Sequence, residues 1–293
     1  MAGETYLEGA WDIHVHASPS LFPRWGDALD LADEISQTSM SGFVLKYHHG
    51  SSVEAAYLTN KIHGDLKIFG GVTLNYPVGG LNPHAVDTAI ALGAKFVWLP
   101  TIHAANHGSV FGMLGGFHFQ KSDTELHIER GITILNEQGE IESSLKEILD
   151  LIHDKSVILA TGHISPHEIY ELKKYIESEK LEIPLLLNHV LFKTSELKAE
   201  QINELAGDNV WIETVYLTVS PMVDPVPVHK VAEIMRKTDD AKWIIASDSG
   251  QEHNIKSPHA LSKYAEMLVE QGMEEKRIVR MLKDEPYLLL HSD

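Results

Sequence analysis

The sequence has no cysteine, which excludes disulfide bonds and thiolate metal ligands. It also lacks any apolar run of the roughly 18 residues that a membrane-spanning helix needs. Basic residues are few: 24 Lys plus Arg face 42 Asp plus Glu, which gives a net charge of −18. Because a surface of that sign repels a polyanion and no basic stripe is present, we expect no nucleic-acid partner.

The N-terminal segment lacks the basic stretch and apolar core of a secretory signal, and it contains Glu4 and Glu8. These absences together predict a cytoplasmic protein without a membrane partner. The sequence leaves the oligomeric state open, a homo-oligomer included.

Short apolar or β-branched runs alternate with amphipathic segments along all 293 residues. The predicted strands are Trp11–His16, Phe43–His48, Lys67–Leu74, Lys95–Pro100, Val157–Gly162, Pro184–His189, Val210–Val215 and Trp243–Ala246. The predicted helices are Asp27–Met40, Ser52–His63, Pro83–Leu92, Ile141–Asp154, Pro166–Ser178, Lys198–Ala206, Val228–Lys237 and His259–Glu270. Ser or Asn followed by Pro, as at Ser165-Pro166, Asn82-Pro83 and Ser257-Pro258, marks helix starts.

Eight strand–helix alternations predict an α/β fold with a parallel sheet, and the number eight favours closure into a (β/α)8 TIM barrel, which needs about 250 residues. A doubly wound open sheet is the alternative, but no GxGxxG motif follows the first strand. Residues 102–140 form an insertion after strand four, with a hairpin turning at Gln138-Gly139. Residues 273–290 form a C-terminal helical tail, expected to pack outside the barrel. We therefore expect residues 1–293 to form one domain.

The first strand carries the motif Asp12-Ile13-His14-Val15-His16. With 18 histidines in the chain, about one HxH pair is expected by chance, so the motif alone is weak. Its position matters more, because the period of two in a strand places His14 and His16 on one face. Two imidazoles on one face at the end of a barrel strand can bind one metal ion.

Other predicted strands also end in polar residues. His163 follows strand five, His189 ends strand six, Asp248 follows strand eight, and strand two ends in Lys46-Tyr47-His48-His49. In a closed barrel these carboxyl ends converge on one mouth, where active sites lie. This coincidence indicates a metal site much more strongly than the HxH pair does.

This order of residues resembles the amidohydrolase superfamily of metal-dependent hydrolases, over essentially the whole chain from His14 to Asp248. The resemblance implies that His14, His16 and Asp248 hold a more buried metal. It also implies that His163 and His189 hold a second metal or the substrate, and that Asp248 takes a proton from the metal-activated water.

One departure from the superfamily pattern concerns strand four, where many binuclear members have a bridging carboxylated Lys or a Glu. Here the strand ends Leu99-Pro100-Thr101 and offers no such group. Lys46 on strand two is the nearby candidate for a carboxylated bridge, and a mononuclear centre is equally compatible. By alternation, Val44, Lys46 and His48 share one face, and burying an unpaired lysine among the helices would be costly. We therefore expect Lys46 to lie within reach of the metal centre, as a carbamate or as an ammonium group.

The expected chemistry is hydrolysis of a small-molecule amide, lactone or related cyclic bond. A divalent ion, Zn foremost with Mn, Fe or Co also suited to nitrogen and oxygen ligands, would activate the water. Asp248 would act as base, and the metal, His163 or His189 would polarise the substrate carbonyl. Arg24, His48 and His103 are candidates for substrate binding, Arg24 through a substrate carboxylate.

Three other functions compete with hydrolysis. Metal-dependent decarboxylation or deamination uses nearly the same ligands on the same barrel. Phosphoesterases also begin with an Asp-x-His-x-His strand, but no phosphate-binding cluster of Arg and Lys is present. A non-catalytic metal- or ligand-binding barrel is compatible with the fold, although the presence of Asp248 argues for turnover.

Overall fold

The strands form a single closed ring in the computed structural model, which describes residues 6–118 and 128–292. Within these residues the strands are β1 (Trp11–Val15), β2 (Gly42–Leu45), β3 (Lys67–Phe69), β4 (Gly71–Thr73), β5 (Phe96–Trp98), β6 (Ile158–Ala160), β7 (Leu185–Leu187), β8 (Val210–Val215) and β9 (Lys242–Ala246). All neighbours pair in parallel, in the orders β1-β2-β3 and β4 to β9.

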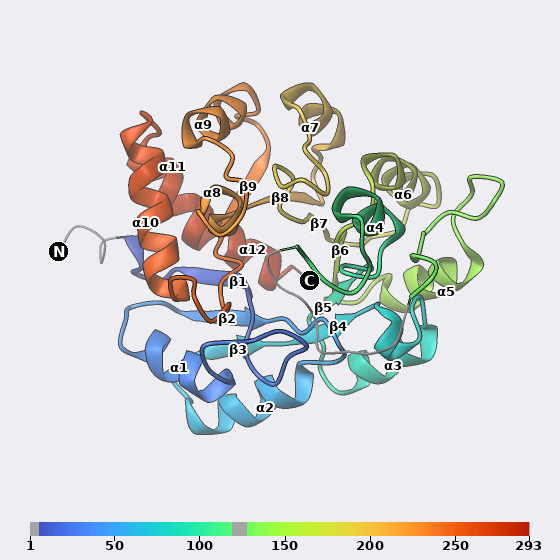
Figure 1. The fold of residues 1–293 in the computed structure, drawn as a ribbon, viewed down its shortest axis with the longest axis horizontal. Helices are drawn as coiled ribbons and strands as arrows, with labels where there is room; N and C mark the ends of the chain where they lie inside the picture. Colours follow the sequence, from blue (N-terminus) through green and yellow to red (C-terminus); the bar gives the residue numbers. More distant parts are fainter. Residues whose placement is uncertain (1–5, 119–127, 293) are drawn as a thin grey trace.

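Two junctions close the ring. β3 and β4 are one barrel strand interrupted at Gly70, where the backbone N–H of Ser52 donates to the carbonyl of Gly71 and the N–H of Gly71 donates to the Ser52 hydroxyl. β1 and β9 meet through a parallel bridge between Val15 and Ser249. The described strands therefore occupy eight barrel positions, which confirms the predicted (β/α)8 barrel, and Figure 1 shows the helices arranged around them.

All eight predicted helices are present, α1 ending four residues earlier than predicted, and α4 and α8 are helices that the sequence did not predict. The helices are α1 (Ala28–Ser36), α2 (Val53–Ile62), α3 (Pro83–Ala91), α4 (Ala105–Phe111), α5 (Ser143–Ile152), α6 (Pro166–Ser178), α7 (Ala199–Leu205), α8 (Tyr216–Val219), α9 (Val228–Lys237), α10 (Ser257–Glu270), α11 (Glu275–Val279) and α12 (Glu285–Leu290). A short 3-10 helix, η2 (Tyr76–Val78), follows β4, and a π-helical turn, η3 (Arg280–Asp284), joins α11 to α12. None of the helices in the described parts of the chain is long and apolar enough to cross a membrane.

The insertion after the fourth barrel strand contains α4 and a tight turn closed by the antiparallel bridge between Leu135 and Ile141. Glu168 of α6 accepts hydrogen bonds from Thr133 Oγ1 and Ile134 N, which fastens the returning segment to the barrel. Residues 119–127 of the predicted insertion lie outside the described residues.

The C-terminal tail is helical as predicted, but its last helix does not pack outside the barrel. Leu289 and Leu290 of α12 belong to the same buried cluster as inward-facing strand residues such as Trp11 and Ile244. Trp211 Nε1 of β8 donates to Glu285 Oε2 at the start of α12. α12 thus covers the amino-terminal end of the strands, and Figure 1 shows it near the centre of the ring. The candidate site lies at the opposite end of the barrel, where the carboxyl-terminal ends of the strands meet.

Candidate metal centre

An irregularity in β1 aims the two histidines of the HxH motif into the barrel. β1 and β2 pair at Asp12↔Phe43 and again at Val15↔Leu45, so β1 holds one residue more than β2 between these points. Such a bulge changes which side chains face inward. Ile13 lies in the interior cluster, whereas Val15 packs in the outer core. His14 and His16 consequently point to the mouth together.

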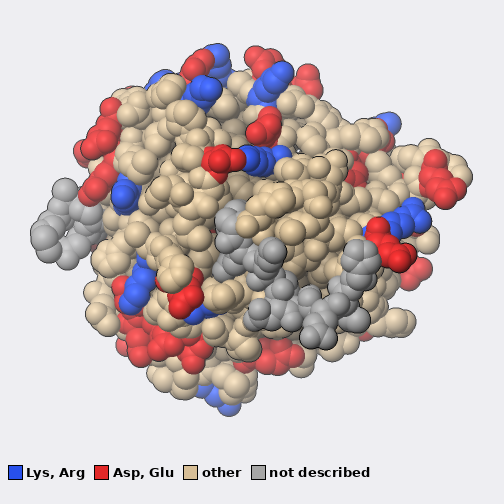
Figure 2. Space-filling model, in the orientation of Figure 1, with Lys and Arg blue, Asp and Glu red and all other residues tan. Residues whose placement is uncertain are grey.

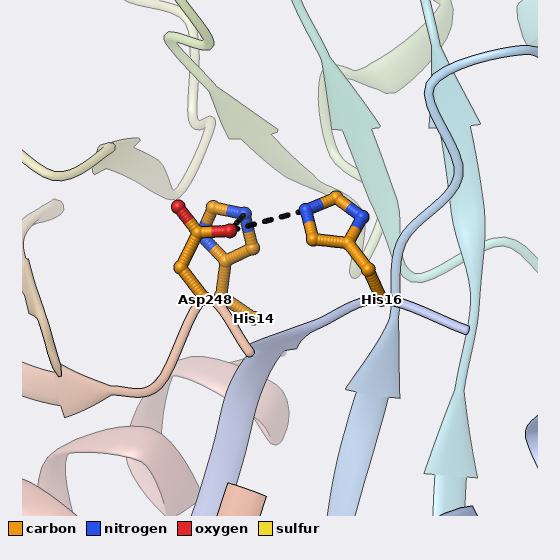
Figure 3. Close-up of side chains that lie close together, drawn as sticks. All are labelled: His14, His16 and Asp248. Carbon is orange, nitrogen blue, oxygen red and sulfur yellow. Dashed lines mark ion pairs between the residues drawn. The ribbon is translucent and has the colours of Figure 1, made fainter. Parts of the chain in front are cut away.

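His14, His16 and Asp248 form a compact buried group, drawn in Figure 3. Asp248 Oδ1 lies 3.2 Å from His16 Nε2 and 3.5 Å from His14 Nε2. Asp248 follows β9, and its backbone N–H donates to the carbonyl of His14, so the junction that closes the barrel also sets this geometry. One oxygen and two ring nitrogens therefore face a common point.

Glu213, which the sequence reasoning missed, holds His14 from behind. Its carboxylate accepts from His14 Nδ1 at 3.1 Å, from Asn188 Nδ2 at 3.0 Å and from the backbone N–H of His189 at 2.8 Å. Burial acts to raise the pKa of Glu213, but the facing His14 and these hydrogen bonds outweigh it and hold the pKa below its usual value. An ionised carboxylate only accepts, so His14 Nδ1 carries a proton and donates it to Glu213, which turns Nε2 toward the cavity.

The tautomer of His16 is set in the same way. Its Nδ1 donates to the carbonyl oxygen of Lys46 at 2.8 Å, which leaves Nε2 to face Asp248. Burial lowers the pKa of His16 well below its usual value, so the ring is neutral at physiological pH. Both histidines of the motif therefore direct Nε2 to the same point, which is the arrangement that a metal ion requires.

His163, after β6, is oriented by the insertion. Its Nδ1 lies 2.9 Å from Nδ1 of His107 on α4, and His107 Nε2 lies 2.8 Å from the carbonyl oxygen of Gly116. A carbonyl only accepts, so His107 donates from Nε2 and accepts at Nδ1. His163 must then donate from Nδ1, which leaves its Nε2 lone pair for a ligand. Asn106, the neighbour of His107, donates to the backbone carbonyl of His163 at 3.0 Å.

His189 and Asp248, both at strand ends, have unusual backbones. Their φ angles are +29° and +51°, a region in which non-glycine residues are uncommon and which occurs often at functional sites. Nδ1 of His189 is buried without a hydrogen-bond partner among the described residues, and burial lowers the pKa of this ring to about 4. A buried ring nitrogen without a partner is costly unless a ligand or an ion satisfies it.

Lys46 lies where the predicted alternation puts it. Val44 belongs to the interior cluster and Phe43 to the outer core, and Lys46 Nζ lies 3.1 Å from His14 Nε2. Burial lowers the pKa of Lys46 to about 8, so the ammonium form still predominates at pH 7 and a minor fraction is neutral amine. The ammonium form donates to the same lone pair of His14 that a metal ion would use.

The end of the fourth barrel strand carries a hydrogen-bonding residue in place of a carboxylate. Thr101 Oγ1 accepts from Asn75 Nδ2 at 2.7 Å and lies 3.0 Å from His48 Nδ1. The ring of His48 stacks on that of His16, with centroids 4.6 Å apart. Thr101 therefore orients the ring of His48, which follows β2. Its neutral hydroxyl does not supply the carboxylate oxygens that could bridge two metal ions.

These side chains surround a cavity of about 20 Å³, enough for one water molecule or ion. A larger ligand requires side chains over the cavity to move. The lining residues are His14, His16, Arg24, Lys46, His48, Phe117, His163, His189, Phe192, Leu217, Asp248 and Gln251. The structure thus brings together every residue predicted for the site except His103.

His103, which the sequence predicts to bind the substrate, does not line this cavity. Its Nδ1 accepts from the backbone N–H of Tyr76 at 3.3 Å, and its ring packs against the Tyr76 ring. The ring belongs to the packing of the loops after β4 and β5.

Comparisons with known proteins agree with this geometry at the level of the fold. An amidohydrolase from Pseudomonas aeruginosa superposes with a TM-score of 0.62 at 11% identity, over 99% of this chain and 98% of that one. A variant of an organophosphorus hydrolase from Deinococcus radiodurans gives 0.59 at 12% identity, over 99% and 95%. N-acetyl-D-glucosamine-6-phosphate deacetylase from Mycobacterium smegmatis gives 0.56 at 11% identity, over 96% and 76%. No curated protein matches the sequence.

The fold is therefore a (β/α)8 barrel like those of these solved structures, as the alternation of strands and helices predicted. Within it, a family model matches residues 9–213, and the chain belongs to that family of unknown function, DUF6282.

Proposed function

We propose that the protein is a metal-dependent hydrolase that cleaves a small-molecule amide, lactone or related cyclic bond. The observation that carries this proposal is the convergence of His14 Nε2, His16 Nε2 and Asp248 Oδ1 on one buried point. A buried carboxylate and two imidazoles form a donor set suited to zinc, manganese, iron or cobalt.

The residues of the site fit a metal ion in two further respects. Glu213 and the Lys46 carbonyl fix both motif histidines in the tautomer that binds through Nε2. The buried Nδ1 of His189 lacks a protein partner within the described chain, so a ligand there would relieve an unsatisfied group. His163 and His189 would hold a second ion or the substrate.

A bound divalent ion would supply Lewis acidity, which lowers the pKa of water to about 7. Asp248 Oδ1 lies at the same point and accepts the proton of the attacking water. His189 polarises the substrate carbonyl, and His163, whose Nε2 presents a lone pair, would do so only through an ion that it holds; the two rings lie at the cavity with centroids 5.0 Å apart. Lys46 acts beside His14, either as an ammonium group that faces the substrate or as a carbamate that adds a carboxylate.

Metal-dependent decarboxylation or deamination is the nearest competing function, because it would use the same residues. A metal- or ligand-binding barrel without turnover is the other. Both are tested by the same experiment.

The protein, assayed for its metal content, is incubated with a panel of amides, lactones and cyclic imides, and the variant Asp248→Asn is compared with it. Loss of the proton acceptor is expected to lower kcat by about 10²–10⁴-fold, with a much smaller change in substrate binding. Exposed Asp208→Asn provides the matched control, since it removes the same charge at the surface. Wild-type turnover by metal-loaded Asp248→Asn, or release of carbon dioxide or ammonia without hydrolysis of the panel, would contradict the proposal.

A further inference from the structure

Arg24 stands out at the cavity because most of its hydrogen-bonding capacity is unused. Its Nε donates to Ser20 Oγ at 3.1 Å, and neither terminal nitrogen has a hydrogen-bond or ion-pair partner among the described residues. The side chain is only half-buried, but protein surrounds the charge closely enough that desolvation lowers the pKa of Arg24 to about 10. The group is therefore still charged at pH 7, and its compensation comes from the nearby charge of Asp248 and the Phe22 ring, 5.7 Å from the guanidinium carbon, without a hydrogen bond to either terminal nitrogen from the described residues.

The backbone fixes Arg24 relative to the candidate base. Arg24 pairs with Gln251 in an antiparallel bridge, and the N–H of Trp25 donates to the carbonyl of Gly250. Gln251 in turn donates from Nε2 to the carbonyl of Asp248 at 2.8 Å. The loop that carries Arg24 is thus joined to the loop that carries Asp248, which fixes the backbone of Arg24 relative to the candidate base.

The charge of the site favours an anion. Arg24 and Lys46 line the cavity together with a single carboxylate, Asp248, and Glu213 stands behind His14. The two positive and two negative charges of these groups cancel. A bound divalent ion would therefore give the site a net positive charge, although the whole chain has a net charge of −18. The cavity would therefore attract an anionic ligand electrostatically, whereas the rest of the negatively charged surface would repel it.

Arg24 favours a carboxylate over a phosphate. The planar guanidinium presents two parallel N–H groups that match the two oxygens of a carboxylate. A phosphate has more charge and more acceptor oxygens than the two terminal nitrogens of one guanidinium can satisfy. Lys46, the other cationic side chain of the lining, lies beside His14, 3.1 Å from its Nε2, and does not add to the Arg24 group. Phe117, Phe192 and Leu217 complete the lining and offer apolar surface to the rest of the molecule.

We propose that the substrate is a carboxylic acid with an apolar frame, whose carboxylate is bound by the two terminal nitrogens of Arg24 while its hydrolysable bond lies at Asp248. This substrate class rests on the proposed hydrolase function.

The test uses benzoate and benzamide, which share one ring and differ in the carboxylate. Binding to the metal-loaded protein is measured by calorimetry at constant ionic strength and pH 7. We expect benzoate to bind the wild type at least about 10-fold more tightly than benzamide, and Arg24→Gln to remove this preference. Arg24→Lys should restore part of it as a point charge, and Arg236→Gln at the surface should leave it unchanged.

A benzoate preference that survives Arg24→Gln would show that the metal or Lys46 binds the carboxylate, and it would overturn the proposal. Equal binding of the two probes by the wild type, or binding of neither, would also overturn it. Metal content and amide hydrolysis are recorded in parallel. A protein that holds metal and hydrolyses neutral amides without benzoate preference would contradict the substrate class alone, whereas a protein without metal or turnover would contradict the function.

Discussion

Single buried residues behind the candidate ligands decide how the site is built. Glu213 does not line the cavity, but its carboxylate accepts three hydrogen bonds. The donors are Nδ1 of His14, Nδ2 of Asn188 and the backbone N–H of His189. Glu213 therefore couples a ligand from the first barrel strand to one from the sixth. Its place in the sequence carries a signal, because a Glu within the apolar strand Val210–Val215 is rarely buried unless it is paired.

We expect Glu213→Gln to weaken metal binding by about 10–100-fold, as is usual when the group that orients a metal ligand is lost. The amide keeps the shape of the side chain but places an N–H₂ group near donors from His14, Asn188 or His189. Competition with a chelator measures the affinity, and Glu137→Gln on an exposed turn is the control. An affinity equal to that of the wild type would show that Glu213 has only a structural role.

At the scale of elements, the strand ends were predictable from the sequence and their connections were not. Alternation placed Lys46 on the inner face of β2, and the structure agrees. Alternation alone, continued from Ile13, would have sent His14 outward, and only the bulge in β1 turns it inward. Sequence patterns do not reveal a bulge, because it depends on the register of the partner strand. Ser257-Pro258 shows a similar limit of sequence patterns. The pair does mark the start of α10, but Ser257 is the first residue of the helix and Lys256 is its N-cap. The Ser257 hydroxyl instead donates to the buried carboxylate of Asp12.

Gly250 tests the junction between β1 and β9. Its φ is +122°, and a Cβ there would lie 2.0 Å from the carbonyl oxygen of His16. We expect Gly250→Ala to lower the free energy of unfolding by at least about 1–3 kcal/mol and to lower metal retention, since the clash moves His16. Thermal denaturation and metal analysis are the measurements.

Gly139→Ala is the matched control, because Gly139 also has a positive φ, +79°, but faces open space. It should lose some stability and keep its metal. Equal metal retention by the two variants would contradict the role of Gly250 in placing His16.

For the whole molecule, the sequence predicted the barrel, because eight strand–helix repeats leave few other topologies. It did not predict that α12 would cover the bottom of the barrel. The apolar residues of α12 are compatible with any buried surface, and only the complete ring of strands creates the one they fill. The same reasoning applies to His103, whose position beside Tyr76 depends on how the loops pack together.

The charge of the molecule also leads to a prediction. The net charge is −18, and on the face in Figure 2 the Lys and Arg side chains are scattered among Asp and Glu. We expect no binding of DNA or RNA at physiological salt, because no concentrated positive surface offsets the repulsion. A fluorescence-anisotropy titration with labelled duplex and single strands checks this. A sub-micromolar complex that weakens with salt would contradict it.

The central claim is that His14, His16 and Asp248 hold a divalent metal ion, and metal analysis of the purified protein tests it most directly. After dialysis against metal-free buffer, elemental analysis by mass spectrometry should find one or two divalent ions per chain in the wild type. The double variant His14→Ala/His16→Ala should retain almost none, while a control that removes two exposed histidines, His84→Ala/His167→Ala, should match the wild type. A wild type without metal, or a His14/His16 double variant with full occupancy, would contradict the account.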